Sequence, residues 1–478
     1  MKKTLFAALL SLLCASFCAS GAAPADSLSA GKDIVKTGWN IGPLPVVAYD
    51  ADKGLQLGAI IQLFNYGDGS NYPNYNSKWY LEASFFTKGS MLFQFMYDEK
   101  ELIPGVRWTS AISAAIDQGM DFFGFGGYQS YYDYGSVASG KAGESYVLPG
   151  GSVSTALFSP FYKTYRTQIL GKTDFVGKIT DHFRWEAGYH PSYFKQTSIN
   201  YGKINKGKSD SQVYPSSEPT LYDYYRKWGL ISDDEAEGGF VGALRFGLCY
   251  DSRDKEGAPS RGIWAEGHVT AAPKWLGTTN PFYRYSLTFR HYVPIVKADV
   301  LTFAYRLNYE GTFGSSAPYY VLPYMTVQGE NWDRDGMGGY RTCRGLMRNR
   351  SVGLDMATYT AELRWRFVKF RLGKQNIALA LNAFSDGTMV TRGRDLSFKY
   401  SQAASDYLAQ KAIYDKFVRP GDSDAPHITA GLGFRFIMNE NFIVAAEYGM
   451  PLTHLDKNNS RYNQDGTGAF YLNVGYLF

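Results

Sequence analysis

The C-terminal end of the chain alternates apolar and polar residues with a period of two. One face of the last segment carries only apolar or aromatic residues, namely Phe470, Leu472, Val474, Tyr476 and Phe478. The segments at 428–436 and 442–450 repeat the alternation, and their opposite faces carry polar residues and glycine. A period of two is the mark of a β-strand whose two faces meet different surroundings. We therefore expect antiparallel strands with an apolar outer face and a polar inner face.

Helices are a poor alternative for this chain. Its 478 residues have a mean hydropathy of -0.27, and outside the extreme N-terminus the charges leave no apolar run long enough for a membrane helix. The 38 Tyr, 31 Phe and 51 Gly favour pleated strands, interfacial aromatic girdles and turns. Any membrane span must therefore be built from strands.

Residues 1–23 have the features of a secretory signal. Lys2 and Lys3 precede an apolar stretch at 5–17, and a cluster of small residues follows at 19–22. We expect cleavage near Gly21 or Ala22, export from the cytoplasm, and a short periplasmic segment at 24–40.

Cleavage would remove Cys14 and Cys18 and leave only Cys249 and Cys343, so no disulfide framework is expected. A single bond between the two remaining cysteines stays open as an alternative in an oxidising compartment. Removing two lysines lowers the basic residues from 49 to 47 against 44 acidic ones, a net charge of about +3. This balance does not indicate nucleic-acid binding.

Sixteen segments carry the strand pattern. They lie at 41–50, 54–64, 78–87, 91–97, 106–115, 162–176, 183–195, 240–251, 263–272, 283–294, 300–310, 358–369, 376–384, 428–436, 442–450 and 470–478. Short connections alternate with long ones, which is how outer-membrane barrels divide periplasmic turns from surface loops. We predict an all-β fold, an antiparallel transmembrane β-barrel of about 16 strands over residues 41–478, with both chain ends on the periplasmic side.

The long sixth connection, at 311–356, carries Arg344 and Gly345. In the two strands that follow it, alternation directs Glu362 and Asp386 into the lumen. A guanidinium fork suits paired carboxylates, so Arg344 on an inward-folded loop would bridge them. The alternative is a solvated loop arginine.

Several motifs resemble a known family. The turn Arg344-Gly345-Leu346, Ala-Glu-Leu-Arg at 361–364, Phe-Ser-Asp-Gly at 384–387 and Gly-Tyr-Leu-Phe at 475–478 are similar, in order and spacing, to the BamA/TamA superfamily of outer-membrane assembly and translocation barrels. Tyr-Asp-Ser-Arg-Asp at 250–254 and Pro-Ser-Arg-Gly at 259–262 support the resemblance.

The resemblance implies that the sixth surface loop folds into the barrel and that Glu362 and Asp386 bind Arg344. It also implies that the terminal aromatic residues target the chain to the outer membrane. Leu346 departs from the family, which has Phe or Tyr at that position. We further expect a member without periplasmic POTRA domains, in which separate partner proteins replace them.

The expected lumen is rich in cations. By alternation it carries Arg245, Arg284, Arg290, Arg306, Arg364, Arg366 and Arg435 against Glu310, Glu362, Asp386 and Glu447. Such a lining would select anionic solutes or polypeptide segments, or it would simply link the strands and the loop. The six His show no metal-ligand spacing, so no metal or other cofactor is expected.

We predict a non-enzymatic protein of the bacterial outer membrane, in contact with lipid, that acts in outer-membrane protein assembly or insertion or in polypeptide export, with assembly or secretion partners. The first alternative is a plugged diffusion channel or pore for small solutes, with the lumenal arginines favouring anionic ones. The second is a barrel lipase, which would need a Ser and a His aligned on one outer face.

Overall fold

The structure, a computed structural model, describes residues 34–478 with gaps at 51–53, 88, 136–144, 148–152, 156–158, 208–212, 215, 217, 298, 327–336, 340 and 475–477. The secretory signal expected at 1–23 and most of the segment expected at 24–40 lie outside the described residues. Within the described residues, no helix combines the length and the apolar character needed to cross a membrane.

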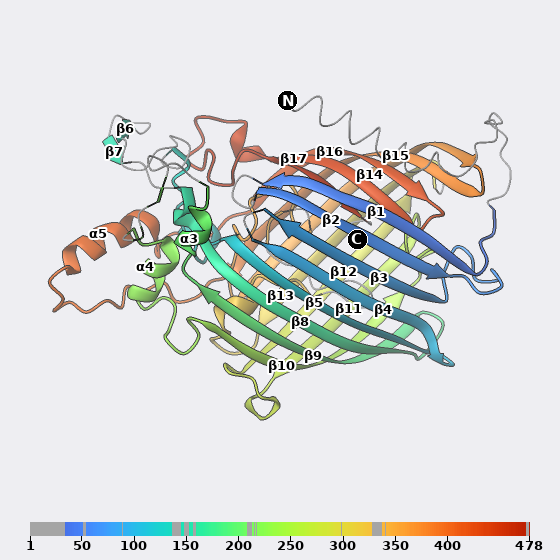
Figure 1. The fold of residues 1–478 in the computed structure, drawn as a ribbon, viewed down its shortest axis with the longest axis horizontal. Coiled ribbons are helices and arrows are strands. Elements are labelled where there is room, and N and C mark those ends of the chain that lie inside the picture. Colours follow the sequence, from blue (N-terminus) through green and yellow to red (C-terminus); the bar gives the residue numbers. More distant parts are fainter. Residues whose placement is uncertain are drawn as a thin grey trace.

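One antiparallel sheet of sixteen strands forms the body of the molecule (Figure 1). Its strands are β1 (Trp39–Asp50), β2 (Gly54–Asn65), β3 (Ser77–Phe86), β4 (Met91–Ile103), β5 (Val106–Asp121), β8 (Lys163–Lys178), β9 (Phe183–Thr197), β10 (Gly238–Asp251), β11 (Gly262–Ala272), β12 (Phe282–Pro294), β13 (Leu301–Thr312), β14 (Asp355–Leu372), β15 (Gln375–Arg392), β16 (His427–Met438), β17 (Phe442–Pro451) and β18 (Ala469–Val474). Strands β6 (Ser145–Val147) and β7 (Val153–Thr155) form a separate hairpin. The predicted antiparallel barrel of 16 strands is confirmed.

Several strands are longer than the hydrophobic pattern indicated. The strand expected at 376–384 continues as β15 to Arg392 and stays paired with β14. After Phe384 both faces of this strand are largely covered by protein, so hydrophobicity stops alternating although the backbone ladder continues. In β14 a bulge between Arg366 and Val368 shifts the register, so the outward face changes there from odd-numbered to even-numbered residues.

The two ends of the barrel differ. Short turns join β8 to β9, β14 to β15 and β16 to β17 at one end, here called the short-turn end, on the right in Figure 1. The long connections at 122–162, 198–237, 313–354 and 393–426 lie at the other end, the loop end. Helical segments of the described loops are η1 (Gly127–Gln129), η2 (Ser159–Tyr162), α3 (Tyr201–Ile204), α4 (Leu221–Lys227), η4 (Lys274–Leu276), η5 (Tyr319–Val321), α5 (Tyr407–Phe417) and η6 (Leu452–His454).

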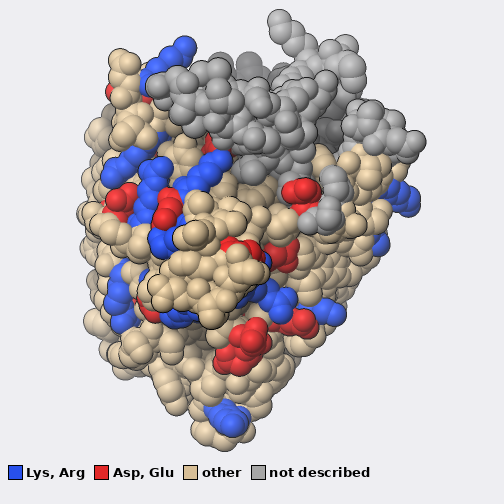
Figure 2. Space-filling view, turned by 90° about the vertical axis from the view of Figure 1, so that its left-hand side faces the viewer, with Lys and Arg blue, Asp and Glu red and all other residues tan. Residues whose placement is uncertain are grey.

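Aromatic side chains from the four long loops pack together over the loop end. Their buried cluster, here called the aromatic cap, includes Phe125, Tyr225, Trp228, Tyr319 and Phe417. Figure 2 shows the molecule from this end. On the part of the surface that is not grey, basic and acidic side chains are interspersed. The cap covers the lumen at the loop end.

The two faces of the sheet differ as predicted. Large exposed apolar side chains on the outside include Trp79, Phe93, Ile112, Phe175, Phe246, Val269, Leu287, Phe303, Leu363, Leu381 and Leu432. Buried polar side chains on the inside include all seven arginines expected there, Arg245, Arg284, Arg290, Arg306, Arg364, Arg366 and Arg435. An apolar exterior around a polar interior is the arrangement of a barrel whose outside meets lipid.

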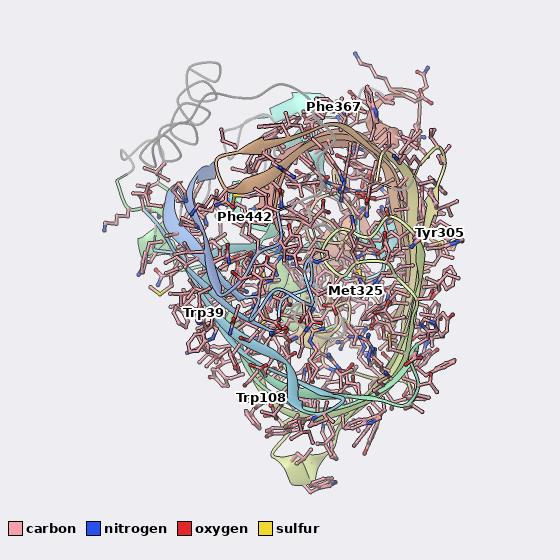
Figure 3. The ribbon with its side chains drawn as sticks, turned by 90° about the vertical axis from the view of Figure 1, so that its right-hand side faces the viewer. Trp39, Trp108, Tyr305, Met325, Phe367 and Phe442 are labelled. Atoms are coloured by element: carbon pink, nitrogen blue, oxygen red, sulfur yellow. The ribbon has the colours of Figure 1, made fainter. Side chains whose placement is uncertain are left out.

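Among the described residues, no ladder joins the first strand to the last. β1 and β18 stand at the two ends of the sheet order, and the inner face of β1 and β2 lies on the outer face of β15, β16 and β17. Inward-pointing Leu44 and Ile60 share a buried cluster with outward-pointing Phe442 and Val444. A Cβ atom on Gly42 would lie 2.7 Å from Phe442 Cδ2, and Figure 3 shows Phe442 beside the N-terminal strands. Side-chain packing therefore closes this overlapped seam.

Prolines weaken the free edge of β1. Pro43 and Pro45 have no N–H to donate, and because one residue separates them, both remove a donor from the same edge. The other edge of β1 pairs with β2 along the whole strand, so the missing donors lie on the free edge. A ladder between β1 and β18 would lack these two hydrogen bonds.

β18 is short and ends at Val474. Phe470 and Leu472 are exposed on its outward face, as expected. The side chain of Val474 and residue Tyr476 lie outside the described residues.

Phe478 departs from the expected outward face. Its ring is buried in the lumen against Tyr292 and Ala304, and its backbone oxygen accepts a hydrogen bond from Arg364 at 3.2 Å. The guanidinium groups of Arg364 and Arg306 lie 4.7 and 5.4 Å from the ring centroid. The prediction that Phe478 continues the outward face is wrong, because its ring lies inside the lumen, where two guanidinium groups face it.

Replacing Phe442 with alanine should loosen the overlapped seam. The residue is 4% exposed, and truncating a buried Phe lowers the free energy of unfolding by about 3 to 5 kcal/mol. The matched control is Phe434→Ala on β16, since Phe434 is 40% exposed on the outer surface. Urea titration of the refolded protein in detergent would compare the two variants, and equal losses would contradict packing of β1 and β2 on β17.

Candidate functional site

The sixth connection, residues 313–354, folds into the barrel between β13 and β14. Its first part packs into the aromatic cap through Tyr319 and Tyr320. Met325 then lies in the interior, near the middle of the view in Figure 3, and Arg344 is fully buried. This inward course confirms the predicted position of the loop.

Arg344 lies against carboxylates from three strands. Its Nε and Nη2 donate to the two oxygens of Asp386 at 2.8 and 3.0 Å, and its backbone N–H donates to Asp386 Oδ2 at 2.9 Å. Its Nη1 donates to Glu362 Oε1 at 2.6 Å and to Glu447 Oε1 at 2.8 Å. The structure thus brings Arg344, Glu362 and Asp386 together and adds Glu447 from β17.

Two arginines of the wall complete the cluster. Arg435 on β16 donates to Glu362 Oε1 at 3.0 Å and to Glu447 Oε1 at 2.8 Å. Arg364 donates from Nε to Glu362 Oε2 at 2.6 Å. With Arg344, three guanidinium groups face three carboxylates. A buried charge without its partner is costly, so the wall depends on the loop being in place.

Glycines allow the loop to approach the wall. Gly345 has a φ of +93°, a conformation that favours glycine, and a Cβ atom there would lie 2.6 Å from the backbone of Gly449 on β17. A Cβ atom on Gly449 would in turn lie 2.9 Å from the Arg344 carbonyl group. The Gly345 N–H donates to the Tyr471 hydroxyl at 2.9 Å, so the turn also contacts β18.

An aromatic ring of the wall covers the guanidinium group. The centre of the Arg344 guanidinium lies 3.6 Å from the centroid of the Phe384 ring, within the range of a cation–π contact. Leu346, which replaces the aromatic residue of the resembled family, is buried. Phe384 therefore supplies an aromatic contact to the arginine from the wall side.

The cluster is suited to holding rather than to reacting. Each of its carboxylates accepts charge-assisted hydrogen bonds from a guanidinium group, which are shorter and stronger than neutral ones. Among the described residues, no group of His, Cys, Asp and Glu could hold a metal ion. The arrangement can act as a reversible clamp between the sixth loop and the wall.

Sequence reasoning left Glu447 and Arg435 out of this cluster, although alternation had directed both into the lumen. Their depth in the barrel depends on register. Glu447 pairs with Gly433, which pairs with Asn382, two rows of Cα partners away from the row of Glu362 and Phe384. Only the register between β15, β16 and β17 shows that these residues meet.

The other candidate residues have structural contacts. Cys249 and Cys343 are buried and free, so the alternative of a bond between them is not supported. Arg290 bonds to Glu266 at 3.2 Å, which favours the strand-linking interpretation of this lumenal arginine.

The model of the Omp85 superfamily domain matches residues 166–478. Among solved structures, CdiB from Escherichia coli aligns with a TM-score of 0.51 at 10% identity, over 92% of this chain and 63% of its own. BamA from Haemophilus ducreyi, in a form lacking POTRA domains 1–3, aligns with a TM-score of 0.48 at 15% identity, over 92% of this chain and 70% of its own. The CdiB likeness supports the barrel fold alone. A search of curated protein sequences gave no match.

Arg344→Ala should destabilise the protein and release the loop. The substitution leaves three buried carboxylates short of one cation, and breaking a buried pair costs about 3 to 5 kcal/mol. Arg344→Lys should recover only part of this loss, because an ammonium group cannot form the fork with Asp386. Urea midpoints of the refolded variants measure both effects.

The reactivity of Cys343 measures directly whether the sixth loop is released from the wall. In a Cys249→Ser background, Arg344→Ala should make Cys343 react faster with a water-soluble maleimide. Arg348→Ala is the control, because Arg348 also lies in the sixth loop but its side chain is 29% exposed. Equal labelling of the two variants would show that Arg344 does not hold the loop.

Proposed function

Because the chain belongs to the Omp85 superfamily, we propose that it is a non-enzymatic barrel of the bacterial outer membrane that inserts polypeptides into that membrane. Its short-turn end faces the periplasm and its loop end faces the cell surface. Partner proteins deliver the clients. Export of polypeptides across the membrane is the second form of the same proposal.

The overlapped seam is the observation that carries this proposal. A ladder of backbone hydrogen bonds resists separation, whereas the apolar packing of β1 and β2 on β15–β17 can part without breaking one. Opening it would expose the free edges of β1 and β18, and an unpaired strand edge is a template for an incoming strand. The seam therefore supports sideways insertion of a client strand.

The contents of the lumen disfavour the other functions. The sixth loop, Phe478 and the aromatic cap occupy the path that a solute or an exported chain would take. These contacts favour insertion at the seam over export through the lumen, and both over a passive diffusion channel.

Targeting and clamping are part of the same proposal. Phe470 and Leu472, exposed on β18, fit a membrane-targeting signal that also includes Val474, Tyr476 and Phe478. The contacts of Arg344 support a role for this residue in holding the sixth loop during opening and closing of the seam.

A reversible disulfide across the seam tests the proposal. Gly42→Cys with Phe442→Cys, in a chain that lacks Cys249 and Cys343, would join the overlapping strands. Liposomes carrying the oxidised protein should fail to insert a small unfolded barrel client, and reduction should restore insertion. Protease protection of the client measures the outcome.

The matched control places a disulfide within the continuous wall. Phe246 and Val269 are Cα partners on β10 and β11 and both point outward, so Phe246→Cys with Val269→Cys should leave insertion unchanged. If the oxidised seam variant inserts the client as fast as this control, the insertion proposal is wrong.

Electrical recording separates insertion from diffusion. The wild-type protein in a planar bilayer should show no steady open current, since the sixth loop and the aromatic cap lie across the lumen. Steady ohmic conductance of the wild-type protein would contradict the insertion proposal and indicate a diffusion channel.

A further inference from the structure

The turn between β10 and β11, residues 252–261, crosses the short-turn end of the barrel. It contains most of the two motifs at 250–254 and 259–262, to which neither the clamp nor the seam gives a role. In the sheet order, β8 and β9 separate β10 from β5, and β12, β13 and β14 separate β11 from β15. The turn nevertheless contacts both groups of strands.

On the first side, the turn reaches β4 and β5 through Glu256. The Glu256 carboxylate lies 2.9 Å from Lys100 Nζ and 3.4 Å from Arg107 Nη1. Burial alone would raise the pKa of Glu256, but the charges of Lys100 and Arg107 hold that pKa below its ordinary value. Glu256 is therefore ionised at neutral pH and pairs with both cations.

On the second side, the turn reaches two other turns. Lys255 Nζ lies 2.8 Å from Asp299 in the β12–β13 turn and 3.4 Å from Glu440 in the β16–β17 turn. A Cβ atom on Gly257 would lie 2.7 Å from Asn441 Oδ1. Lys255 and Gly257 thus seat the turn against the far wall.

The tip of the turn enters the lumen. Ala258 is 1% exposed and packs with Ala378, Ala380, Ile437 and Ile443 from the inner faces of β15, β16 and β17. The two alanines leave room for the tip, and the two isoleucines give it an apolar contact at this point of the lumen.

Two carboxylates of the motif brace the turn internally. Asp251 accepts from Arg253 Nε at 2.9 Å, and the Arg253 guanidinium lies 4.1 Å from the Trp264 ring centroid. Asp254 accepts from the Ser260 N–H at 2.9 Å and from its hydroxyl at 2.5 Å. The turn is therefore a stiff strap rather than a loose connection.

We propose that the turn at 252–261 is a lid that shuts the short-turn end of the lumen and swings away to open the lumen on that side. Glu256 and Lys255 fasten it to opposite walls, and Ala258 seals its tip. The lid is a second closure beside the Arg344 clamp, and it does not depend on what the barrel transports.

Cys249 provides a built-in reporter for the lid. It lies on the inner face of β10, three residues before the turn, and is 1% exposed. In a Cys343→Ser protein it is the only cysteine after residue 33. Its reaction with a charged, water-soluble thiol reagent measures how often water reaches the lumen from the short-turn end.

Glu256→Gln removes one fastening with little change of shape. This variant should label Cys249 about tenfold faster or more than the Cys343→Ser parent, because opening no longer breaks the ion pairs with Lys100 and Arg107. The control is Lys178→Ala, which breaks an ion pair with Asp181 that is exposed in the β8–β9 turn at the same end. It should label at the parent rate.

Lys255→Gln tests the ion pairs of the turn with Asp299 and Glu440. It also keeps the proposal testable if the Glu256→Gln protein does not fold. Glu440 keeps its bond to Arg366 at 3.0 Å in this variant, so no buried carboxylate is left without a cation. Faster labelling of Cys249 in Lys255→Gln supports the lid. Labelling of the folded Gln variants at the parent rate overturns it.

Discussion

Three carboxylates cannot remain ionised inside a barrel wall unless cations lie beside them. Glu362, Asp386 and Glu447 come from three strands, and the guanidinium group of Arg344 contacts all of them. The arginine comes from the sixth loop, not from the wall. The electrostatics of β14, β15 and β17 are therefore complete only when the loop is folded inward, and wall and loop stabilise each other.

The same barrel uses apolar packing where it is closed along its side. Leu44 and Ile60 cover Phe442 and Val444, and Pro43 and Pro45 deprive the free edge of β1 of two donors. Ion pairs with fixed geometry hold the interior, and side-chain packing without a ladder holds the seam. An Omp85 barrel that admits a client through its side needs this division, because the wall must part while the interior stays ordered.

Much of the fold follows from alternation alone. The faces of β16 and β17 and the lumenal positions of Glu362 and Asp386 could be predicted, because a strand repeats every two residues whatever surrounds it. Alternation cannot tell what covers a face. Phe442 points outward as predicted, yet β1 and β2 cover it, which depends on the overlap of strands hundreds of residues apart.

The register between strands and the position of the C-terminal residue could not be predicted from the sequence pattern either. Glu447 joins the clamp because of its depth in the barrel, and the Phe478 ring lies in the lumen among arginines that the local pattern does not place beside it. The role of Glu256 depends on a turn that crosses the barrel to Lys100 and Arg107. Each of these contacts joins parts of the chain that no local pattern connects.

The buried position of Arg344 constrains the order in which the molecule folds. The aromatic cap covers the loop above it and the turn at 252–261 crosses the opposite end, so a charged side chain reaches this position only when one of these closures or the seam is displaced. The sixth loop meets the fewest packed groups if it enters while β1 and β2 still stand away from β15–β17. In that order the growing sheet receives Arg344 before the seam packs, and its charge does not have to cross the apolar contacts of Phe442 and Val444.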